Sequence, residues 1–342
     1  MRTIKQILLS LLYFVVFFAT ISAMVIIPYY NNESMGYQDA SYRKSLAGKI
    51  DYIILGASQG QAGFIPKTLD EELGCYSYNL SIVLMPMHAR KMELEQELSR
   101  NDVKTVVVEV SYDFLQLEAG HDAAVADERV LTRIDNWSGR FEYLTKHIRF
   151  DDWLNVYAHS FVTGIINMKT MYYNRGLNNE MNDSKGHLYR YKADITLTAE
   201  EAAAIHETKP YERDFYKDNY EVLKEILDIC NEHGITTYIV CVPVSDAYVW
   251  EYSNLDDFLQ WGQELAAEKN CLFLDFNLLK TRYEDFTDKE SFSDKDHMSE
   301  EGAIVFTQRY IEVVKKIEAG EDVSGMFYSS YKDMIADSPY AK

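Results

Sequence analysis

The stretch DYIILGASQGQAG, residues 51–63, joins a short apolar run to a turn made of small residues. Residues 51–55 have the composition of a buried β-strand, and the pentapeptide GASQG at 56–60 follows at once. This order matches the G-x-S-x-G pattern, in which a serine on a sharp strand-to-helix turn exposes its hydroxyl. Because the pattern is short, two interpretations stay open: Ser58 is a nucleophile, or its hydroxyl caps the following helix.

Beyond this stretch, short strands alternate with helices along much of the chain. Strands are predicted at residues 51–55, 75–81, 104–111, 235–243 and 271–276. Helices are predicted at residues 65–74, 86–99, 218–234, 255–269 and 299–317. Such an alternation predicts a parallel sheet with helices on both faces. Ligands of these sheets bind beyond the carboxyl ends of the strands, and Ser58 directly follows such an end.

The alternation is interrupted after the third predicted strand. Residues 112–213 separate that strand from the next helix, and this distance is too long for a plain connection. Two interpretations stay open: a cap or substrate-binding subdomain, or a helical insertion without a role in the site. We therefore predict an α/β domain at 35–318 that contains this insertion. An anchor with its flank at 1–34 precedes the domain, and a polar C-terminal tail at 319–342 follows it.

The N-terminal segment has the pattern of a membrane anchor. Arg2 and Lys5 precede the uncharged apolar run at 7–27, whose 21 residues span about 30 Å as a helix, the thickness of a bilayer core. The basic flank predicts a cytoplasmic N-terminus and an extracytoplasmic domain. The length of the run favours an uncleaved anchor; a cleaved signal peptide is the main alternative, and a buried soluble helix the third. Residues 28–48 are predicted to be a polar linker.

Composition and charge exclude several classes of protein. The chain of 342 residues is 47% hydrophobic, which is typical of a globular protein and not of a disordered one. Its formal net charge of −20 repels phosphates, so nucleic acid is not an expected partner. The four cysteines lack C-x-x-C spacing, so no zinc site is predicted, and buried free thiols are the default for Cys241 and Cys271.

A second candidate element, SFSDKDHMSEEGA at 291–303, lies just before the last predicted helix. A serine nucleophile needs a base, and the base needs a carboxylate that holds its tautomer. His297 is the candidate base and Asp294 the candidate carboxylate, with Asp296 as the competing one. Ser299 is predicted to cap the helix. The alternatives are a solvated acidic loop or a weak metal site made by the two aspartates and His297.

The early G-x-S and the late D-x-x-H-x-x-x-x-G-A together resemble the SGNH (GDSL-like) hydrolase superfamily, over about residues 50–318 apart from the insertion. The resemblance implies a flavodoxin-like three-layer fold with a five-stranded parallel sheet. It implies Ser58 as nucleophile, His297 as base and Asp294 as the residue that orients it. It also implies an oxyanion hole from the backbone N–H groups of Ser58 and Ser81, with Asn79 as a side-chain donor or a structural turn residue. No metal and no organic cofactor are implied.

One block of the chain departs from the family pattern. The family commonly shows Gly-x-Asn-Asp after the third strand, whereas this chain has VVVEVSYDF at 106–114. Glu109 and Ser111 stand there, and packing at the strand end is their expected role. Loss of one oxyanion donor costs a rate factor on the order of hundreds. Either Asn79 or the insertion supplies that donor, or the protein is a slow or specialised member.

An N-terminal anchor followed by an SGNH-like domain also resembles proteins that acylate cell-surface polymers beside membrane-bound O-acyltransferases. We therefore expect a membrane-anchored, extracytoplasmic serine esterase or O-acyltransferase that acts on ester-linked acyl groups of a cell-surface polysaccharide or similar glycopolymer. Its expected partners are that glycan, the membrane and a membrane-bound O-acyltransferase. Two alternatives stay open: an inactive binding or scaffold protein of a cell-envelope acylation system, and an esterase or lipase that acts on small esters.

Overall fold

The computed structural model describes residues 2–30, 35–112, 123–173, 184–196, 198, 200–201, 204 and 217–339. These residues form two compact units. One, here the helical unit, comprises Met1–Ser45 and Gly120–Asn182. The other, here the α/β unit, comprises Leu46–Ala119 and Asp183–Lys342. Each unit is described on its own.

A five-stranded parallel sheet forms the centre of the α/β unit, with strand order β2-β1-β3-β4-β5. The strands are β1 (Tyr52–Leu55), β2 (Ser77–Asn79), β3 (Thr105–Glu109), β4 (Thr236–Cys241) and β5 (Leu272–Asp275). All five predicted strands are therefore present. The chain passes from β1 to β2 on one side and then crosses to β3 on the other side, so the order in which strands are added reverses at β1, the switch point where such sheets bind ligands.

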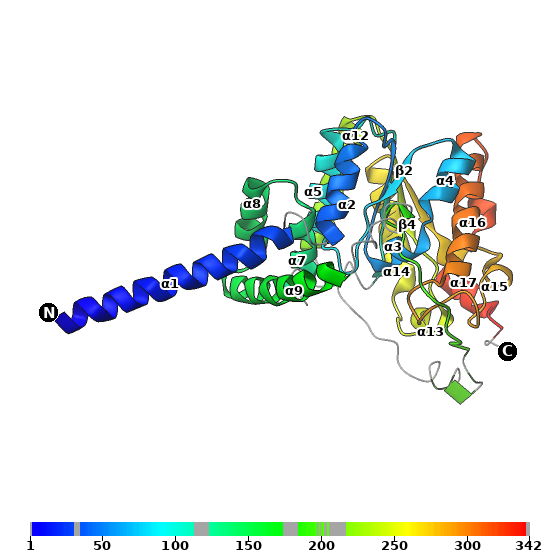
Figure 1. Cartoon of the computed structure of the whole chain (residues 1–342). Helices are drawn as coiled ribbons and strands as arrows, with labels where there is room; N and C mark the ends of the chain where they lie inside the picture. Colours follow the sequence, from blue (N-terminus) through cyan, green and yellow to red (C-terminus); the bar gives the residue numbers. More distant parts are fainter. Residues whose placement is uncertain are drawn as a thin grey trace. The chain divides into compact units, whose positions relative to one another are not determined.

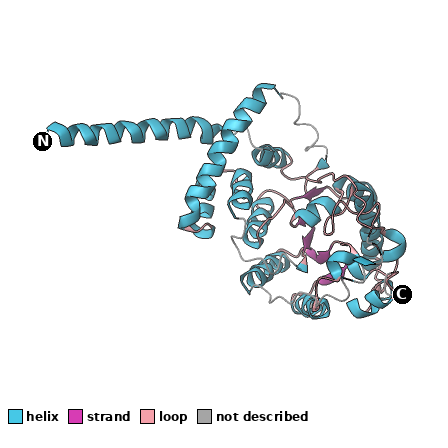
Figure 2. Cartoon of the chain, turned by 90° about the horizontal axis from the view of Figure 1, so that it is seen from below, coloured by secondary structure: helices cyan, strands magenta, loops and turns pink. Residues whose placement is uncertain are grey.

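Helices cover both faces of the sheet (Figures 1 and 2). One face carries α4 (Pro66–Leu73) and α16 (Glu300–Glu318), which pack on each other, and the other carries α5 (Met87–Leu98) and α12 (Lys217–Glu232), which do likewise. Between β4 and β5 runs α14 (Leu255–Glu268), which packs on β5. The predicted three-layer α/β fold is thus confirmed.

Local sequence signals explain where the principal helices begin and end. Gly74 ends α4 in the left-handed region, with φ 68°, as C-terminal glycines do. Pro86 precedes the first residue of α5. The Ser299 hydroxyl accepts the Gly302 N–H at 3.1 Å, which confirms it as the N-cap of α16. One side of α16 then packs in the core with residues of the strands, through the rings of Phe306 and Tyr310 and the aliphatic side chains of Ile311, Val313 and Val314.

Short helices complete the α/β unit, and two of them correct the prediction of a polar tail at 319–342. They are α3 (Ser58–Gly63), α13 (Asp246–Val249), η3 (Phe276–Leu278), α15 (Arg282–Asp285), η4 (Ser324–Met326) and α17 (Tyr331–Ala336). Tyr331 is buried and donates to Asp275 at 2.6 Å. Ser338 donates to Asp246 at 2.9 Å. Residues 331–338 therefore pack on the α/β unit through buried hydrogen bonds. Their polar composition alone did not predict this packing.

The helical unit consists of α1 (Arg2–Pro28), α2 (Met35–Ser45), α7 (Ala123–Arg133), α8 (Trp137–His147), η2 (Phe150–Asp152) and α9 (Trp153–Tyr173). Helix α2 corrects the prediction of a linker at 28–48. Its polar residues are used in packing, because buried Asp39 pairs with Arg43 at 3.1 Å and with Arg133 of α7 at 3.1 Å. The sequence pattern gave no sign of such pairing.

The predicted insertion at 112–213 is divided between the two units. Its helices α7, α8 and α9 belong to the helical unit, whereas residues 184–196 belong to the α/β unit. Residues 113–122, 174–183 and most of 197–216 lie outside the described residues. In the described part of the chain, one helix is long and apolar enough to cross a membrane, at Ile4–Pro28.

Candidate active site

The turn after β1 places Ser58 at the first position of α3, at the carboxyl edge of the sheet. Its Oγ lies 2.7 Å from Nε2 of His297. On the other side of the ring, Nδ1 of His297 lies 2.8 Å from Oδ1 of Asp294. The structure therefore brings together three residues that the sequence separates by up to 239 positions. The arrangement is that of a serine hydrolase triad.

A tight loop holds Asp294 and His297 in register. Asp294 Oδ1 also accepts the backbone N–H groups of Asp296 and His297, at 3.2 and 2.8 Å. The loop is closed at its base by a β-bridge between Phe292 and Met298, both buried. A carboxylate only accepts, so Nδ1 of the neutral ring carries the proton and Nε2 faces the Ser58 hydroxyl as an acceptor.

The charges of this loop shift its pKa values. Burial lowers the pKa of His297, but hydrogen bonds and attraction from Asp294 and Asp296 outweigh it and raise that pKa to about 9. Burial raises the pKa of Asp294, and its hydrogen bond to His297 and attraction to the imidazolium reverse that effect, so the net pKa is lower than usual. Asp296 Oδ1 lies 3.4 Å from Nδ1, so Asp294 at 2.8 Å is the carboxylate that orients the ring.

This shift predicts how the reactivity of Ser58 depends on pH. A general base acts in its neutral form. Because the His297 pKa is raised, the part of the rate-against-pH curve in which the labelling rate increases lies at higher pH than for an ordinary histidine. The second-order rate of labelling by a fluorophosphonate is expected to rise from pH 6 and level off above about 9. Asp296→Asn removes a negative charge that raises the His297 pKa, so the labelling rate of this variant should increase at lower pH than that of wild type. A profile that is flat between pH 6 and 10 would contradict this assignment.

A buried glutamate supports the turn that carries Ser58. Glu109, at the end of β3, accepts the backbone N–H of Ala57 at 2.7 Å, and Gly60 donates its N–H to the same carboxylate. Its side chain is fully buried, and Oε2 lies 3.9 Å from the guanidinium of Arg90. Burial raises the pKa of Glu109, while Arg90 and the two N–H groups lower it, with a net rise.

The close approach of Glu109 explains both glycines of the G-x-S-x-G pattern. A Cβ at Gly56 would lie 2.6 Å from Glu109 Oε2 and 2.8 Å from Ser81 Oγ. A Cβ at Gly60 would lie 2.9 Å from the same Ser81 oxygen and 3.1 Å from Glu109 Cβ. The turn therefore packs its backbone directly on these two side chains, and larger residues would push it away.

The structure corrects the predicted oxyanion donors Ser81 and Asn79. The Ser81 N–H donates to Asn79 Oδ1 at 3.1 Å. The Asn79 amide donates to the carbonyls of Gly60 and Phe64, at 2.9 and 3.3 Å, and the residue is fully buried. Asn79 therefore fixes the path of α3, and neither donor is directed at the site. The Ser58 N–H remains, because the first N–H groups of a helix lack helical partners.

Residues 187–196, which follow a turn at 184–186, contain no helix or strand and join the parts of the site. Leu188 donates its N–H to the Gln61 carbonyl at 3.0 Å, and the Arg190 carbonyl accepts the Glu300 N–H at 2.9 Å. The Arg190 guanidinium lies 3.2 Å from Asp294 Oδ2 and 3.5 Å from Ser293 Oγ. The sequence did not predict this arginine, which lies inside the expected insertion and belongs to no motif.

Among the residues that the structure describes, Asp294, Asp296 and His297 form the one group that could hold a cation. Their ligand atoms lie within 4.8 Å of one another. However, both ring nitrogens of His297 are already engaged, Nδ1 by Asp294 at 2.8 Å and Nε2 by Ser58 at 2.7 Å. A metal ion at this position would have to break the contact that orients the ring, so the cluster fits the role of a triad better than that of a metal centre.

Similarity to known proteins is found among solved structures, at low sequence identity. No protein-family model matches the chain, and no curated protein matches it. Among solved structures, the chain is similar to a GDSL-like lipase from Bacteroides thetaiotaomicron, at 8% identity over 82% of this chain and 99% of that chain, with a TM-score of 0.36. It is also similar to a variant of an acetyl xylan esterase from Geobacillus stearothermophilus, at 12% identity over 78% of this chain and 95% of that chain, with a TM-score of 0.37. Independently of these similarities, the strand order β2-β1-β3-β4-β5 is the flavodoxin-like order that the sequence resemblance to the SGNH (GDSL-like) superfamily implies.

Proposed function

We propose that the chain is an SGNH-type serine enzyme that cleaves or transfers ester-linked acyl groups. The observation that carries this proposal is the continuous contact from Ser58 Oγ through His297 to Asp294, at 2.7 and 2.8 Å. An inactive scaffold protein needs no such alignment of hydroxyl, imidazole and carboxylate. The alignment therefore favours an enzyme over the scaffold alternative.

The reaction follows from the geometry. Neutral His297 accepts the Ser58 proton at Nε2 while Oγ attacks the ester carbonyl, and the backbone N–H of Ser58 donates to the oxyanion that forms. The imidazolium, held by Asp294, returns its proton to the leaving alcohol, and an acyl-serine remains. Water or a sugar hydroxyl then gives a proton to His297 as it attacks the acyl group. The imidazolium passes that proton to Ser58 Oγ when the bond between Oγ and the acyl carbon breaks, which restores the free serine and neutral His297. With Ser81 and Asn79 engaged elsewhere, the rate is expected to lie below that of an enzyme with a full set of donors.

We further propose that α1 is a retained anchor and that the α/β unit lies outside the cell membrane. The basic residues before the apolar run support this orientation. Retention is supported by packing, because Val25 and Tyr29 at the end of α1 are buried in the helical unit and Ser22 hydrogen-bonds to Tyr157 of α9. Removal of α1 would expose these contacts. A cell-surface glycan is then the proposed substrate, with a membrane-bound O-acyltransferase as the proposed partner.

The test is product analysis with the full chain in detergent micelles. An O-acetylated oligosaccharide and p-nitrophenyl acetate are offered separately, each with and without an unacetylated oligosaccharide as acceptor. Wild type is expected to release acetate or to form the acetylated acceptor, and Ser58→Ala is expected to do neither. Equal product from wild type and Ser58→Ala would refute the proposal. Turnover of p-nitrophenyl acetate alone would favour the alternative of an esterase for small esters.

A further inference from the structure

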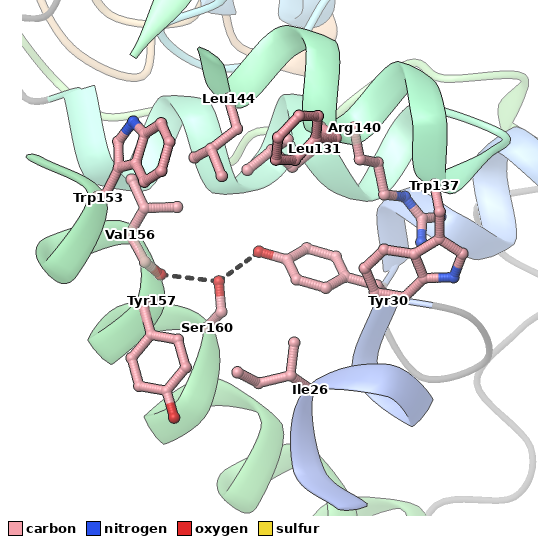
Figure 3. Close-up of a pocket in the computed structure, with 11 residues that line it drawn as sticks. Ile26, Tyr30, Leu131, Trp137, Arg140, Leu144, Trp153, Val156, Tyr157 and Ser160 are labelled. Atoms are coloured by element: carbon pink, nitrogen blue, oxygen red, sulfur yellow. Dashed lines mark hydrogen bonds between the residues drawn. The ribbon is translucent and has the colours of Figure 1, made fainter. Parts of the chain in front are cut away.

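The helical unit contains an apolar cavity of about 190 Å³ that the triad chemistry does not use. It lies between the end of α1, helix α7, helix α8 and helix α9 (Figure 3). Ile26, Leu131, Leu144 and Val156 contribute aliphatic side chains, and aromatic rings and Ser160 form most of the rest of the wall. Arg140 also lines the cavity; its guanidinium lies over the rings of Tyr30 and Trp137, and its Nε donates to the Ile134 carbonyl at 3.0 Å. Enclosed apolar cavities on the order of 150 Å³ bind small hydrocarbons, and this cavity, which is partly open to the surface, has a similar volume. The size and lining therefore suit a segment of hydrocarbon chain.

The hydroxyl groups at this cavity are already paired. Ser160 donates to the Val156 carbonyl at 2.8 Å, which leaves its oxygen to accept from the Tyr30 hydroxyl (Figure 3). The Tyr157 hydroxyl pairs with Ser22. A polar ligand would have to break these bonds within a buried site, at a cost that an apolar ligand avoids. The pairing of these hydroxyl groups therefore favours an apolar ligand over one that needs their hydrogen bonds.

The contacts of α9 place this cavity beside the candidate membrane span. The span Ile4–Pro28 has 25 residues, or about 37 Å of helix, somewhat more than the roughly 30 Å of a bilayer core. Tyr157 of α9 contacts Phe18 and Ser22, which lie inside this span. Ile26 and Tyr30, which line the cavity, come at its end. If α1 crosses a bilayer, the cavity lies at the level where hydrocarbon meets the headgroups.

The helices that form the cavity also carry exposed apolar side chains. Phe150 is 82% exposed and Leu154 is 72% exposed, and Phe141, Val162 and Ile165 are also exposed. An apolar surface of this kind on a water-soluble protein marks an interaction site. Tryptophan and tyrosine side chains, such as Trp137 at the cavity mouth, are enriched where proteins meet the bilayer interface. The surface is continuous with α1, through α9, and this favours lipid as its neighbour.

We propose that the cavity of the helical unit binds an acyl chain of a bilayer phospholipid, with α8 and α9 seated in the leaflet at the C-terminal end of α1. This inference rests on the anchoring of α1 that is part of the proposed function. It does not depend on the chemistry at Ser58. The site holds the helical unit to the bilayer surface by an acyl chain as well as by the membrane span.

The test uses the full chain in phosphatidylcholine nanodiscs that contain a trace of phosphatidylcholine with a diazirine on one acyl chain. After irradiation, cross-linked residues are located by mass spectrometry. Cross-links are expected at Ile26, Leu131 and Val156. Leu144→Trp and Val156→Phe, which fill the cavity from two different helices, are expected to lower these cross-links about fivefold or more by excluding the chain. Leu154→Trp changes the exposed side of α9 and is the matched control, with cross-links in the cavity at the wild-type level.

Cross-links to residues 7–17 of α1 report anchoring separately and are expected in every variant. If these appear but the cavity is unlabelled, or if filling variants with a wild-type thermal midpoint label the cavity as strongly as wild type, the acyl-chain site is refuted while the anchor stands. If residues 7–17 are unlabelled too, both the anchor and this site fail. An exposed face shielded from lipid by a second membrane protein would likewise leave the cavity unlabelled and overturn the proposal.

Discussion

Replacing His297 by alanine is expected to lower the rate of ester cleavage by about 10³-fold or more, with little change in KM. The side chain is the acceptor placed for the Ser58 proton, at 2.7 Å, and in its absence the hydroxyl must ionise into water. The measurement is kcat and KM for p-nitrophenyl acetate, together with the rate of fluorophosphonate labelling. Labelling should fall in parallel, because the probe needs the same activated oxygen.

His233→Ala is the matched control. This exposed histidine directly follows α12 and contacts the Ile229 carbonyl of that helix through Nδ1 at 2.9 Å, so its removal should leave both rates unchanged. A labelling rate for His297→Ala within a factor of about ten of wild type would contradict the triad. In that case the contact between Ser58 and His297 would be a structural hydrogen bond.

Ser58 and His297 were predictable because their motifs are local. In each, a few consecutive residues specify a turn, and the parallel sheet brings the turns to the same edge. Helix boundaries at Gly74, Pro86 and Ser299 were predictable for the same reason, since a cap needs only its neighbours. These features do not depend on which distant residue a side chain meets.

The oxyanion donors were not predictable in this way. The neighbourhood of Asn79 indicated a donor after the second strand, but the direction of its amide is set by the Gly60 and Phe64 carbonyls on α3 and just after it. Arg190 and the buried pair Asp39–Arg43 are similar cases. From sequence alone a charged residue is expected to be exposed, unless its partner in the folded chain is known. What the sequence could not supply was the tertiary partner of each polar side chain.

The tertiary contacts of Glu109 were not predictable from sequence either, and replacing this residue is expected to have a large effect. It was expected only to pack at the strand end, yet it accepts two N–H groups of the turn that holds Ser58, from Ala57 and Gly60. Glu109→Ala leaves these buried donors without an acceptor, and it leaves Arg90 without its carboxylate. Breaking a buried pair from one side costs about 3–5 kcal/mol. The thermal midpoint of the α/β unit is therefore expected to fall by roughly 10 °C.

Glu109→Gln separates positioning of the turn from charge. Its amide oxygen can still accept the Ala57 N–H, so fluorophosphonate labelling at 20 °C should stay closer to wild type than in Glu109→Ala. The thermal midpoint is still expected to fall, because Arg90 loses the negative charge of Glu109. The exposed Glu232→Ala is the control and should change neither measurement. If Glu109→Ala keeps the wild-type midpoint and labelling rate, the carboxylate does not hold the turn. The position of Ser58 would then depend on α3 and the close packing at Gly56 and Gly60 alone.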